Sequence, residues 1–506
     1  MRKINFRPIL FVLVSFCFAL VFARQIFIAS VFHIIFVCMV LGALFAICIK
    51  YKCLKRFVLI FCSFVFGVGY YFLGFTVFSG IDYISNVLVE ARVANISSTA
   101  TYTYLTLDNV KINGEGKGFN ISCNILGGSV EQGNIIVFEA KLNKVNLFED
   151  DQFKSHYYKN NTPYKTSVNY ENLIIKDGFL KLNEKISQKF KKFVENNYSK
   201  DIAGIVSSVI IGDKYLLDDQ INDDFSLSGV GHLLAISGLH ISFIISMISF
   251  VLEKLKLKRL PTFIIVLVLL AFYCYICNFS PSVTRASLMS LTYMLAKVLC
   301  RKYDRLNSIS FCALLILLFK PLYIFDAGFL LSFGSVFCIF MLSSIIKDAL
   351  TKLKLKRNFA STLAVTFATQ LGLIPIMCLF YDSMNLLSFV TNLICVPLFE
   401  IAFILTFVLT IVCMILPFLS FILKFVELIY FLIITVASFV ASLKFAVIPL
   451  TKCKNMFVVG CYGTMFLFSR FVNINKTSRL CFGIGLFGFS ILLSVLIWNI
   501  KRIMLK

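Results

Sequence analysis

Long, uninterrupted apolar stretches are the dominant pattern in this chain. Three lie near residues 8–23, 26–49 and 57–78, and others follow near 233–252, 261–277, 283–299, 308–323, 326–346, 359–380, 386–416, 419–443, 457–471 and 480–500. Roughly 18 consecutive apolar residues cross a bilayer as a helix, so most of these runs are long enough to span. The run at 386–416 is either one helix or a pair hinged at Pro397. The pattern therefore predicts a polytopic α-helical membrane protein with about 13 or 14 spans.

Residues 80–177 follow a different pattern, with a period of two. In FNISCNIL, Phe119, Ile121, Cys123 and Ile125 alternate with polar residues, and NIIVFEAKL alternates in the same way. Turns that contain glycine, such as NGEGKG, separate these runs. Roughly four to six short strands in such a length are typical of a small β-barrel or sandwich. We expect this β domain to lie outside the membrane.

The segment 178–200 has helical periodicity. Apolar residues recur every three or four positions, and Lys181, Lys185, Lys189 and Lys192 form a row beside them. This predicts a basic amphipathic helix at the membrane boundary, which either lies on anionic lipid or contacts a phosphate backbone; spacing does not separate the two roles. The apolar piece at 202–212 is too short to span, so we expect it to be interfacial or re-entrant.

Composition excludes a soluble globular protein. The chain has 506 residues, of which 59% are hydrophobic and 15% charged, and so little charge cannot cover so much apolar surface. The net charge of +23 suggests a nucleic-acid partner. However, residues 80–200 hold 15 basic and 13 acidic residues, whereas the rest of the chain holds 34 and 13. Most of the excess lies in short loops between apolar runs, as the preference for cytoplasmic Lys and Arg explains.

The positions of these charges predict an orientation. Basic loops lie near 50–56, 254–259, 301–305 and 347–357, at alternate turns, so we expect them on the cytoplasmic side. The β domain is then extracytoplasmic. We interpret the first apolar run as a retained membrane helix, because no clear small-residue cleavage site follows it.

Polar residues and prolines interrupt the second group of apolar runs. Polar groups at bilayer depth are costly and mark either a substrate path or a packed interhelical contact. Gln370 and Asn392 each precede a proline by five residues, a pattern that favours broken helices lining a cavity. The candidate path residues are Ser237, Gly238, His240, Arg285, Asp326, Gln370, Pro375, Asn392 and Pro397.

Motifs of catalysis and cofactor binding are missing from the sequence. There is no GxSxG, HExxH or P-loop, and the four histidines are too few for a multi-histidine metal centre. We expect no cofactor, no metal and no enzymatic activity. Ser237 and His240 would permit a membrane hydrolase, although no oxyanion donor or third member is recognisable. A secondary transporter or a carrier of lipid-linked substrates on a similar scaffold is the other alternative.

Several motifs resemble those of the ComEC competence family of bacterial inner-membrane proteins. They are IIGDKYLL, GVGHLLAISGLHIS, SPSVTRASLM, KPLYIFDAGFLLSFGSV and ATQLGLIPIMCLFYDSMNLLSFVTNLICVPL, in the family's order, over residues 201–415. The N-terminal part resembles the family's amino-terminal domain mainly in architecture, which implies that the β domain is OB-like. The resemblance implies a channel that passes a single strand of transforming DNA into the cytoplasm.

The resemblance also implies partners. Many members of the family continue into a metallo-β-lactamase-like domain, whose HxHxDH-type motif is absent from this sequence. A separate nuclease would then act on the second strand, and a cytoplasmic DNA-translocating ATPase is a further expected partner beside membrane lipids. We expect N-terminal membrane helices at 1–79, the OB-like domain at 80–177, the basic helix at 178–200, the channel block at 201–415 and C-terminal membrane helices at 416–506.

Overall fold

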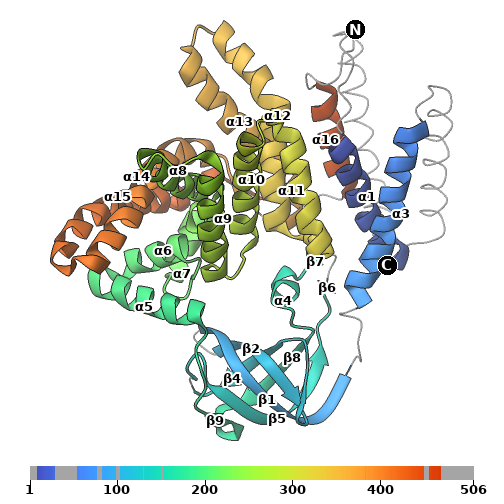
Figure 1. Ribbon diagram of the computed structural model, residues 1–506, viewed down its shortest axis with the longest axis vertical. Helices are drawn as coiled ribbons and strands as arrows, with labels where there is room; N and C mark the ends of the chain where they lie inside the picture. Colours follow the sequence, from blue (N-terminus) through green and yellow to red (C-terminus); the bar gives the residue numbers. More distant parts are fainter. Residues whose placement is uncertain are drawn as a thin grey trace.

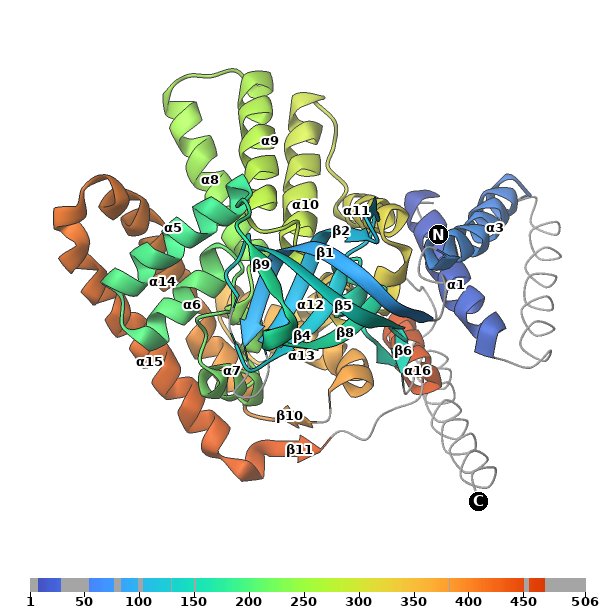
Figure 2. The same ribbon diagram turned by 90° about the horizontal axis from the view of Figure 1, so that it is seen from below.

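The computed structural model describes residues 8–28, 54–76, 83–98, 103–128, 130–149, 152–381, 383–449 and 455–468. A β-barrel lies below a block of helices (Figure 1). Seen from below, the barrel covers the middle of the block (Figure 2). Helices α14 (Ser388–Ile415) and α15 (Leu423–Ser442) lie to one side of it, and α1 (Pro8–Ile28) and α3 (Leu54–Thr76) lie to the other.

Five strands close the barrel. They are β1 (Tyr83–Ser98), β2 (Thr103–Ile112), β4 (Ile121–Leu126), β5 (Ile135–Lys144) and β8 (Tyr164–Asn169). They pair in the order β1–β2–β4–β8–β5 and back to β1, and only the β4–β8 pair is parallel among these five. This closed order is that of an OB-type barrel, as the sequence led us to expect. The shorter strands are β3 (Glu115–Gly116), β6 (Phe148–Glu149), β7 (Gln152–Phe153) and β9 (Ile174–Lys176).

The period-two pattern explains the barrel core. Ile121, Cys123 and Ile125 of β4 are buried, and Ile136 and Phe138 of β5 meet them inside the barrel. Side chains of a strand alternate between its two faces, so the intervening polar residues point outward. The alternation read from the sequence is thus confirmed in both strands.

The helical block follows the barrel in the chain. Its helices are α5 (Leu182–Asn197), α6 (Lys200–Ile210), α7 (Asp219–Leu227), α8 (Gly238–Lys254), α9 (Arg259–Ile276), α10 (Pro281–Val298), α11 (Arg305–Phe319), α12 (Ala327–Lys352), α13 (Arg357–Phe380), α14, α15 and α16 (Asn455–Phe468). Short 3₁₀ helices include η2 (Gly231–Leu234) and η3 (Pro321–Phe325). Strands β10 (Ser383–Asn385) and β11 (Val447–Pro449) pair beside the α14–α15 hairpin, and α4 (Ser155–Lys159) belongs to the barrel.

Helix α6 lies in the core of the block. Every residue from Ile202 to Ile210 is buried, and α5, α14 and α15 pack around it. Apolar residues surround α6 on all sides, so the helix is stable only inside protein. The segment is too short to span, as its length indicated, and its interfacial or re-entrant placement stays a prediction.

Five described helices or helical segments are long and apolar enough to cross a membrane. They are Arg259–Ile276, Ala327–Lys352, Arg357–Phe380, Ser388–Ile415 and Pro417–Ser442. Shorter apolar helices lie at Pro8–Arg24, Val58–Leu73 and Arg305–Phe319. These features support a multi-pass membrane protein. The runs expected near 26–49 and 480–500 fall outside the described residues, so the total of 13 or 14 spans stays a prediction.

Two turns of the helical block lie on its barrel side. Asn183 of α5 donates to Asn278 in the α9–α10 turn (2.8 Å), and Lys159 of α4 pairs with Asp326 at the start of α12 (2.8 Å). Each helix separates its two ends by 1.5 Å per residue. The basic turns at 255–258, 299–304 and 353–356 therefore lie at the helix ends away from these barrel contacts. The cytoplasmic side of these turns stays a prediction.

Candidate functional site

The stretch GVGHLLAISGLHIS does not form one helix. It contains η2, an extended break and the start of α8 at Gly238, so the helix expected from residue 233 begins later than predicted. Ser237 is the N-cap of α8. Its Oγ accepts from the backbone N–H of His240 (3.5 Å), and His240 Nδ1 accepts from the backbone N–H of Ser237 (3.1 Å). The two residues form a reciprocal capping box.

This capping box bears on the hydrolase alternative. A serine nucleophile needs its hydroxyl hydrogen-bonded to a general base. Here His240 Nδ1 faces the backbone N–H of Ser237, and the Ser237 hydroxyl oxygen faces the backbone of His240. Both side chains are used to end a helix, so the geometry lends no support to a catalytic pair.

His240 also joins α8 to α14. Its side chain is buried, and its ring stacks on Phe403 with centroids 4.0 Å apart. Phe399 lies on the same helix with its ring centroid 6.0 Å away. The imidazole is therefore one element of an aromatic contact between two helices, and its polar edge satisfies the cap.

A second polar contact joins α13, α14 and the loop before η2. Asn392 Nδ2 donates to the Ser388 carbonyl (2.7 Å) and to the Gly229 carbonyl (3.4 Å), while Ser388 Oγ donates to Gln370 Oε1 (3.3 Å). Gly229 has a φ of +82°, and a Cβ placed there would lie 2.4 Å from Ser388 Cβ. Only glycine permits this approach. Gln370 and Asn392 thus share one polar contact through Ser388.

The two prolines do not break their helices. Pro375 lies inside α13 and Pro397 inside α14, and both helices continue past them. Membrane helices tolerate an internal proline where neighbouring helices and polar side chains compensate for the lost hydrogen bond. The interruption that the amide–proline pattern favoured is not found in α13 or α14, and of the two alternatives for residues 386–416 the single helix is the one observed. The broken-helix pattern that favoured a secondary transporter is not found in these two helices.

Asp326 lies apart from these contacts, at the barrel. It is buried as the N-cap of α12, where Oδ2 accepts from the backbone N–H of Phe329 (3.1 Å), and it pairs with Lys159. Lys320 adds a hydrogen bond to the Lys159 carbonyl (3.1 Å). The residue singled out as a path candidate therefore ties α12 to the barrel.

A buried ion network forms the other tie. Arg92 of β1 donates Nε and Nη2 to Asp108 of β2 (2.8 and 2.6 Å), and Nη1 and Nη2 to Glu184 of α5 (2.7 and 3.0 Å). Its Nη1 also donates to the Phe179 carbonyl (3.1 Å). The Arg92 side chain is only 2% exposed. The bidentate geometry on both carboxylates fixes α5 against the barrel wall.

Lys181 completes this network. It is the N-cap of α5, and its Nζ donates to Asp108 Oδ2 (2.6 Å). Burial opposes ionisation of Asp108, but the hydrogen bonds and charges of Arg92 and Lys181 outweigh it and lower the pKa of this carboxyl. Lys181 is therefore paired with a carboxylate and differs from the rest of its row.

The other three lysines of the row remain exposed. Lys185, Lys189 and Lys192 lie along one face of α5, at spacings of four and three residues. On the opposite face, Phe190 and Val194 are buried against the block. Within the part of the chain that the structure describes, no carboxylate forms an ion pair with these three amines. They are available to an anionic partner.

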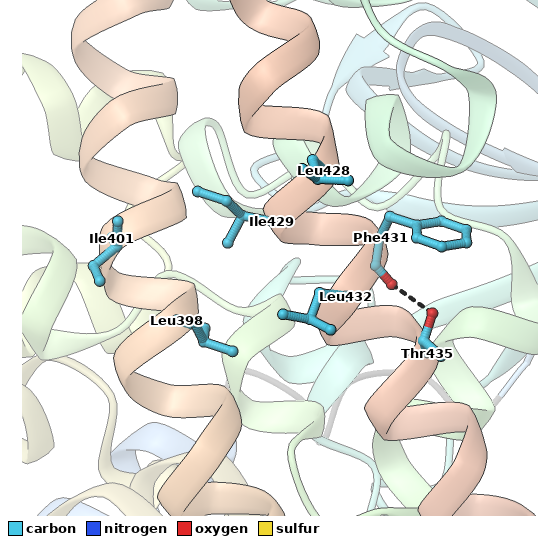
Figure 3. Close-up of a pocket in the computed structure, with 7 residues that line it drawn as sticks. All are labelled: Leu398, Ile401, Leu428, Ile429, Phe431, Leu432 and Thr435. Carbon is cyan, nitrogen blue, oxygen red and sulfur yellow. Dashed lines mark hydrogen bonds between the residues drawn. The ribbon is translucent and has the colours of Figure 1, made fainter.

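An apolar groove of about 450 Å³ lies between α14 and α15. Figure 3 shows its lining: Leu398 and Ile401 from α14, and Leu428, Ile429, Phe431, Leu432 and Thr435 from α15. The Thr435 hydroxyl donates to the Phe431 carbonyl (2.8 Å), as the dashed line shows. Its lining offers no charge for a polyanion, so this groove is a surface suited to lipid.

Among the described residues, no group of three or more His, Cys, Asp and Glu side chains is arranged to hold a metal ion.

Comparison with known families places these contacts in context. A family model described as "Competence protein" matches residues 209–472, just over half of the chain. The chain belongs to the competence protein family. The matched competence region includes the α8 capping box, Arg285, Asp326 and the contact between Gln370 and Asn392, whereas the barrel and α5 precede it.

Two curated relatives agree with this assignment. The chain is 30% identical over 207 residues to ComE operon protein 3 of Bacillus subtilis, and 22% identical over 229 residues to Recombination protein 2 of Haemophilus influenzae. The aligned segments cover 41% and 42% of this chain, but only 26% and 29% of those proteins. The chain thus spans between a quarter and a third of the curated relatives it matches. No solved structure matches it.

Sequence analysis missed the residues that join the barrel to the helical block. Arg92 and Glu184 are 92 positions apart, and Lys159 meets a partner in another domain. The one local signal was Glu184 three residues after Lys181, because an acidic residue at that spacing is typical of a helix start.

Proposed function

We propose that this competence protein forms a channel of the bacterial cytoplasmic membrane that admits a single strand of DNA during natural transformation. The observation that carries the proposal is the docking of an OB-type barrel on the helical block, through the Arg92 network to α5 and through Lys159 to Asp326 of the competence region. OB folds bind single strands by combining basic grooves with aromatic stacking. A barrel held at fixed positions would deliver a strand to the helices beneath it.

The proposed phosphate contacts outside the competence region are Lys185, Lys189 and Lys192. They lie on α5, the helix that joins the barrel to the competence region. Three free amines along a helix attract a polyanion without reading its sequence, which suits a channel for DNA of any origin. A separate nuclease for the second strand and a cytoplasmic ATPase that draws the strand inward are the partners that this function requires.

Genetic complementation tests the function directly. In a naturally competent host that lacks its own competence-family membrane protein, expression of this chain should restore transformation. The control is a chain truncated after α5, which keeps the barrel and lacks the competence region. Transformation that stays at the background level with the full chain in the membrane would overturn the proposal.

The lysine row has a separate test. Replacing Lys185, Lys189 and Lys192 together by Gln should weaken binding of an oligothymidylate to the purified full chain. The plot of log affinity against log salt should also become less steep, with the magnitude of its slope smaller by up to about 2, because each single-strand phosphate contact contributes about 0.7. The matched control replaces three exposed lysines of the barrel, Lys111, Lys165 and Lys176, by Gln. An equal loss of slope in both variants would refute a specific role for the row.

A further inference from the structure

Arg285 has an unusual environment for a charged group in a membrane protein. It lies in the second turn of α10, and its Nη1 is buried without a hydrogen-bond partner. No described carboxylate forms an ion pair with it. Its guanidinium lies over the Phe333 ring of α12, 5.7 Å from the centroid. A ring face supplies part of the compensation that a buried cation needs, but leaves the N–H donors unmatched.

The start of α8 lies beside this guanidinium. A Cβ placed on Gly238 would lie 4.0 Å from Arg285 Nη2 and 3.9 Å from Ala286 Cβ. The first turn of a helix presents N–H groups without intrahelical acceptors and a partial positive charge. The Ser237 hydroxyl accepts a hydrogen bond from the backbone N–H of His240. The backbone N–H groups of Gly238 and Leu239 therefore need an acceptor from outside the helix. At Gly238 itself no side chain covers the backbone.

The Arg285 guanidinium and the N-terminus of α8 therefore lie side by side. Both are positive, so neither compensates for the charge of the other. Such a pair is stabilised by an anion that accepts from both, and a phosphate group matches the planar fork of an arginine together with a helix N-terminus. We infer that Arg285 and the first turn of α8 bind a phosphodiester group of a single DNA strand. This inference rests on the proposed function, and it assigns a ligand to one point of the path.

The position of the site fits entry of a strand. Asn278, in the turn before α10, accepts from Asn183 of α5, so α10 begins on the barrel side of the block. Helix α8 runs antiparallel to α9 through the short turn at 255–258 and begins on that side as well. Arg285 is thus placed where a strand leaving the barrel would first meet the helices.

Arginine modification tests the site. The full chain in detergent is treated with phenylglyoxal, and modification of Arg285 is followed by mass spectrometry, with Arg301 in the α10–α11 turn as the internal control. An oligothymidylate should slow modification of Arg285 by about tenfold, as expected for an arginine–phosphate contact, and leave Arg301 unchanged. A thymine oligomer with an uncharged backbone should protect neither. Equal rates at Arg285 with and without the oligothymidylate would overturn the assignment.

Two further arms distinguish this inference from the proposed function. Inorganic pyrophosphate in place of the oligothymidylate tests for an anion site alone, and protection by pyrophosphate only would overturn the DNA assignment. In the complementation assay, Arg285→Gln should lower transformation about tenfold at a normal membrane level, and Arg285→Lys should recover part of it. Full activity of Arg285→Gln beside an active parent chain would refute the site and leave the channel intact. Failure of the parent chain would refute the channel. If Arg285→Gln does not accumulate, Arg285→Lys and the protection assay decide.

Discussion

Ser237 and His240 cap the start of α8 with a hydroxyl and an imidazole, groups that are catalytic in many enzymes. The hydroxyl accepts a backbone N–H, the imidazole accepts another, and the ring rests on Phe403. Polar side chains in an apolar segment are explained here by the unsatisfied N–H groups of a helix that begins inside the block. The same residues would look catalytic from their identities alone.

Substitution of Ser237 tests this explanation. Asn caps a helix as well as Ser does but is no nucleophile, so Ser237→Asn should keep transformation in the complemented host near the parent level. Ser237→Ala removes the cap, which costs about 1 kcal/mol, and should lower the amount of folded protein in the membrane. The melting temperature in detergent and the transformation frequency are measured together. Loss of activity in both variants at normal stability would instead favour a chemical role for the hydroxyl.

Asp108 predicts a dependence on pH. Its pKa is lowered in the folded protein, so the ionised carboxylate contributes stability above its ordinary pKa of about 3.9. That contribution is lost as the pH falls through the lowered value. The gap in melting temperature between the parent chain and Asp108→Asn should therefore be widest near neutral pH and narrow on acidification. Calorimetry of the full chain in detergent measures it, and a gap that does not change with pH contradicts the prediction.

Among the elements, α12 and α13 approach each other closely at two glycines. A Cβ on Gly372 of α13 would lie 2.3 Å from Cys338 Cβ of α12, and one on Gly334 would lie 2.7 Å from Ile376 Cδ1. Tyr462 of α16 donates to the Gly372 carbonyl (2.8 Å) from another direction. Small residues at such crossings let two membrane helices approach closely.

Gly372→Ala should separate these two helices. The added methyl clashes with Cys338, so we expect a loss of about 1–3 kcal/mol, seen as a lower melting temperature. Adding Cys338→Gly removes the clash and should recover part of the loss. Gly69→Ala in α3 is the control, because a Cβ there meets no atom within 4 Å. A drop as large in the control as in Gly372→Ala would show that the crossing is not the cause.

Local pattern predicted the elements better than the contacts between them. The alternation of Ile121, Cys123 and Ile125 predicted the barrel because a strand has one inner face. The length of the apolar runs predicted α12 and α13, because a helix that crosses a membrane needs roughly 18 consecutive apolar residues. The break at Ala235 and the burial of α6 were missed, because both are decided by neighbours that lie far along the chain. Among the candidate site residues, the membrane depth of each stays a prediction, and the partners of Asp326 and Lys181 could not be predicted from the sequence.

For the molecule as a whole, two ties fix the barrel to the helical block. One joins β1, β2 and α5 through Arg92, and the other joins α4 to α12 through Lys159 and Asp326. Two separate points of attachment resist rotation of the barrel about either one. The barrel is thereby held in one orientation over the helices.

The second tie predicts unequal effects from its two partners. Lys159→Met leaves the buried carboxylate of Asp326 without its cation and should cost up to about 3 kcal/mol. Asp326→Asn keeps an N-cap and leaves only a partly exposed amine, so it should cost less. The double variant should behave like Asp326→Asn alone. Melting temperatures of the four full-length chains measure this, and a larger effect of Asp326→Asn than of Lys159→Met would contradict it.

The two ties are also separated in time during synthesis. Every partner of Arg92 has been made once Glu184 leaves the ribosome, whereas Lys320 and Asp326 lie 161 or more residues beyond Lys159. Asp326 lies 142 residues beyond Glu184, so at about 5–20 residues per second the second tie waits roughly 7–28 s longer. The barrel and α5 are therefore complete before the surface that receives them exists. Assembly of this protein should proceed as the docking of membrane helices, one pair after another, against a barrel that has already been made.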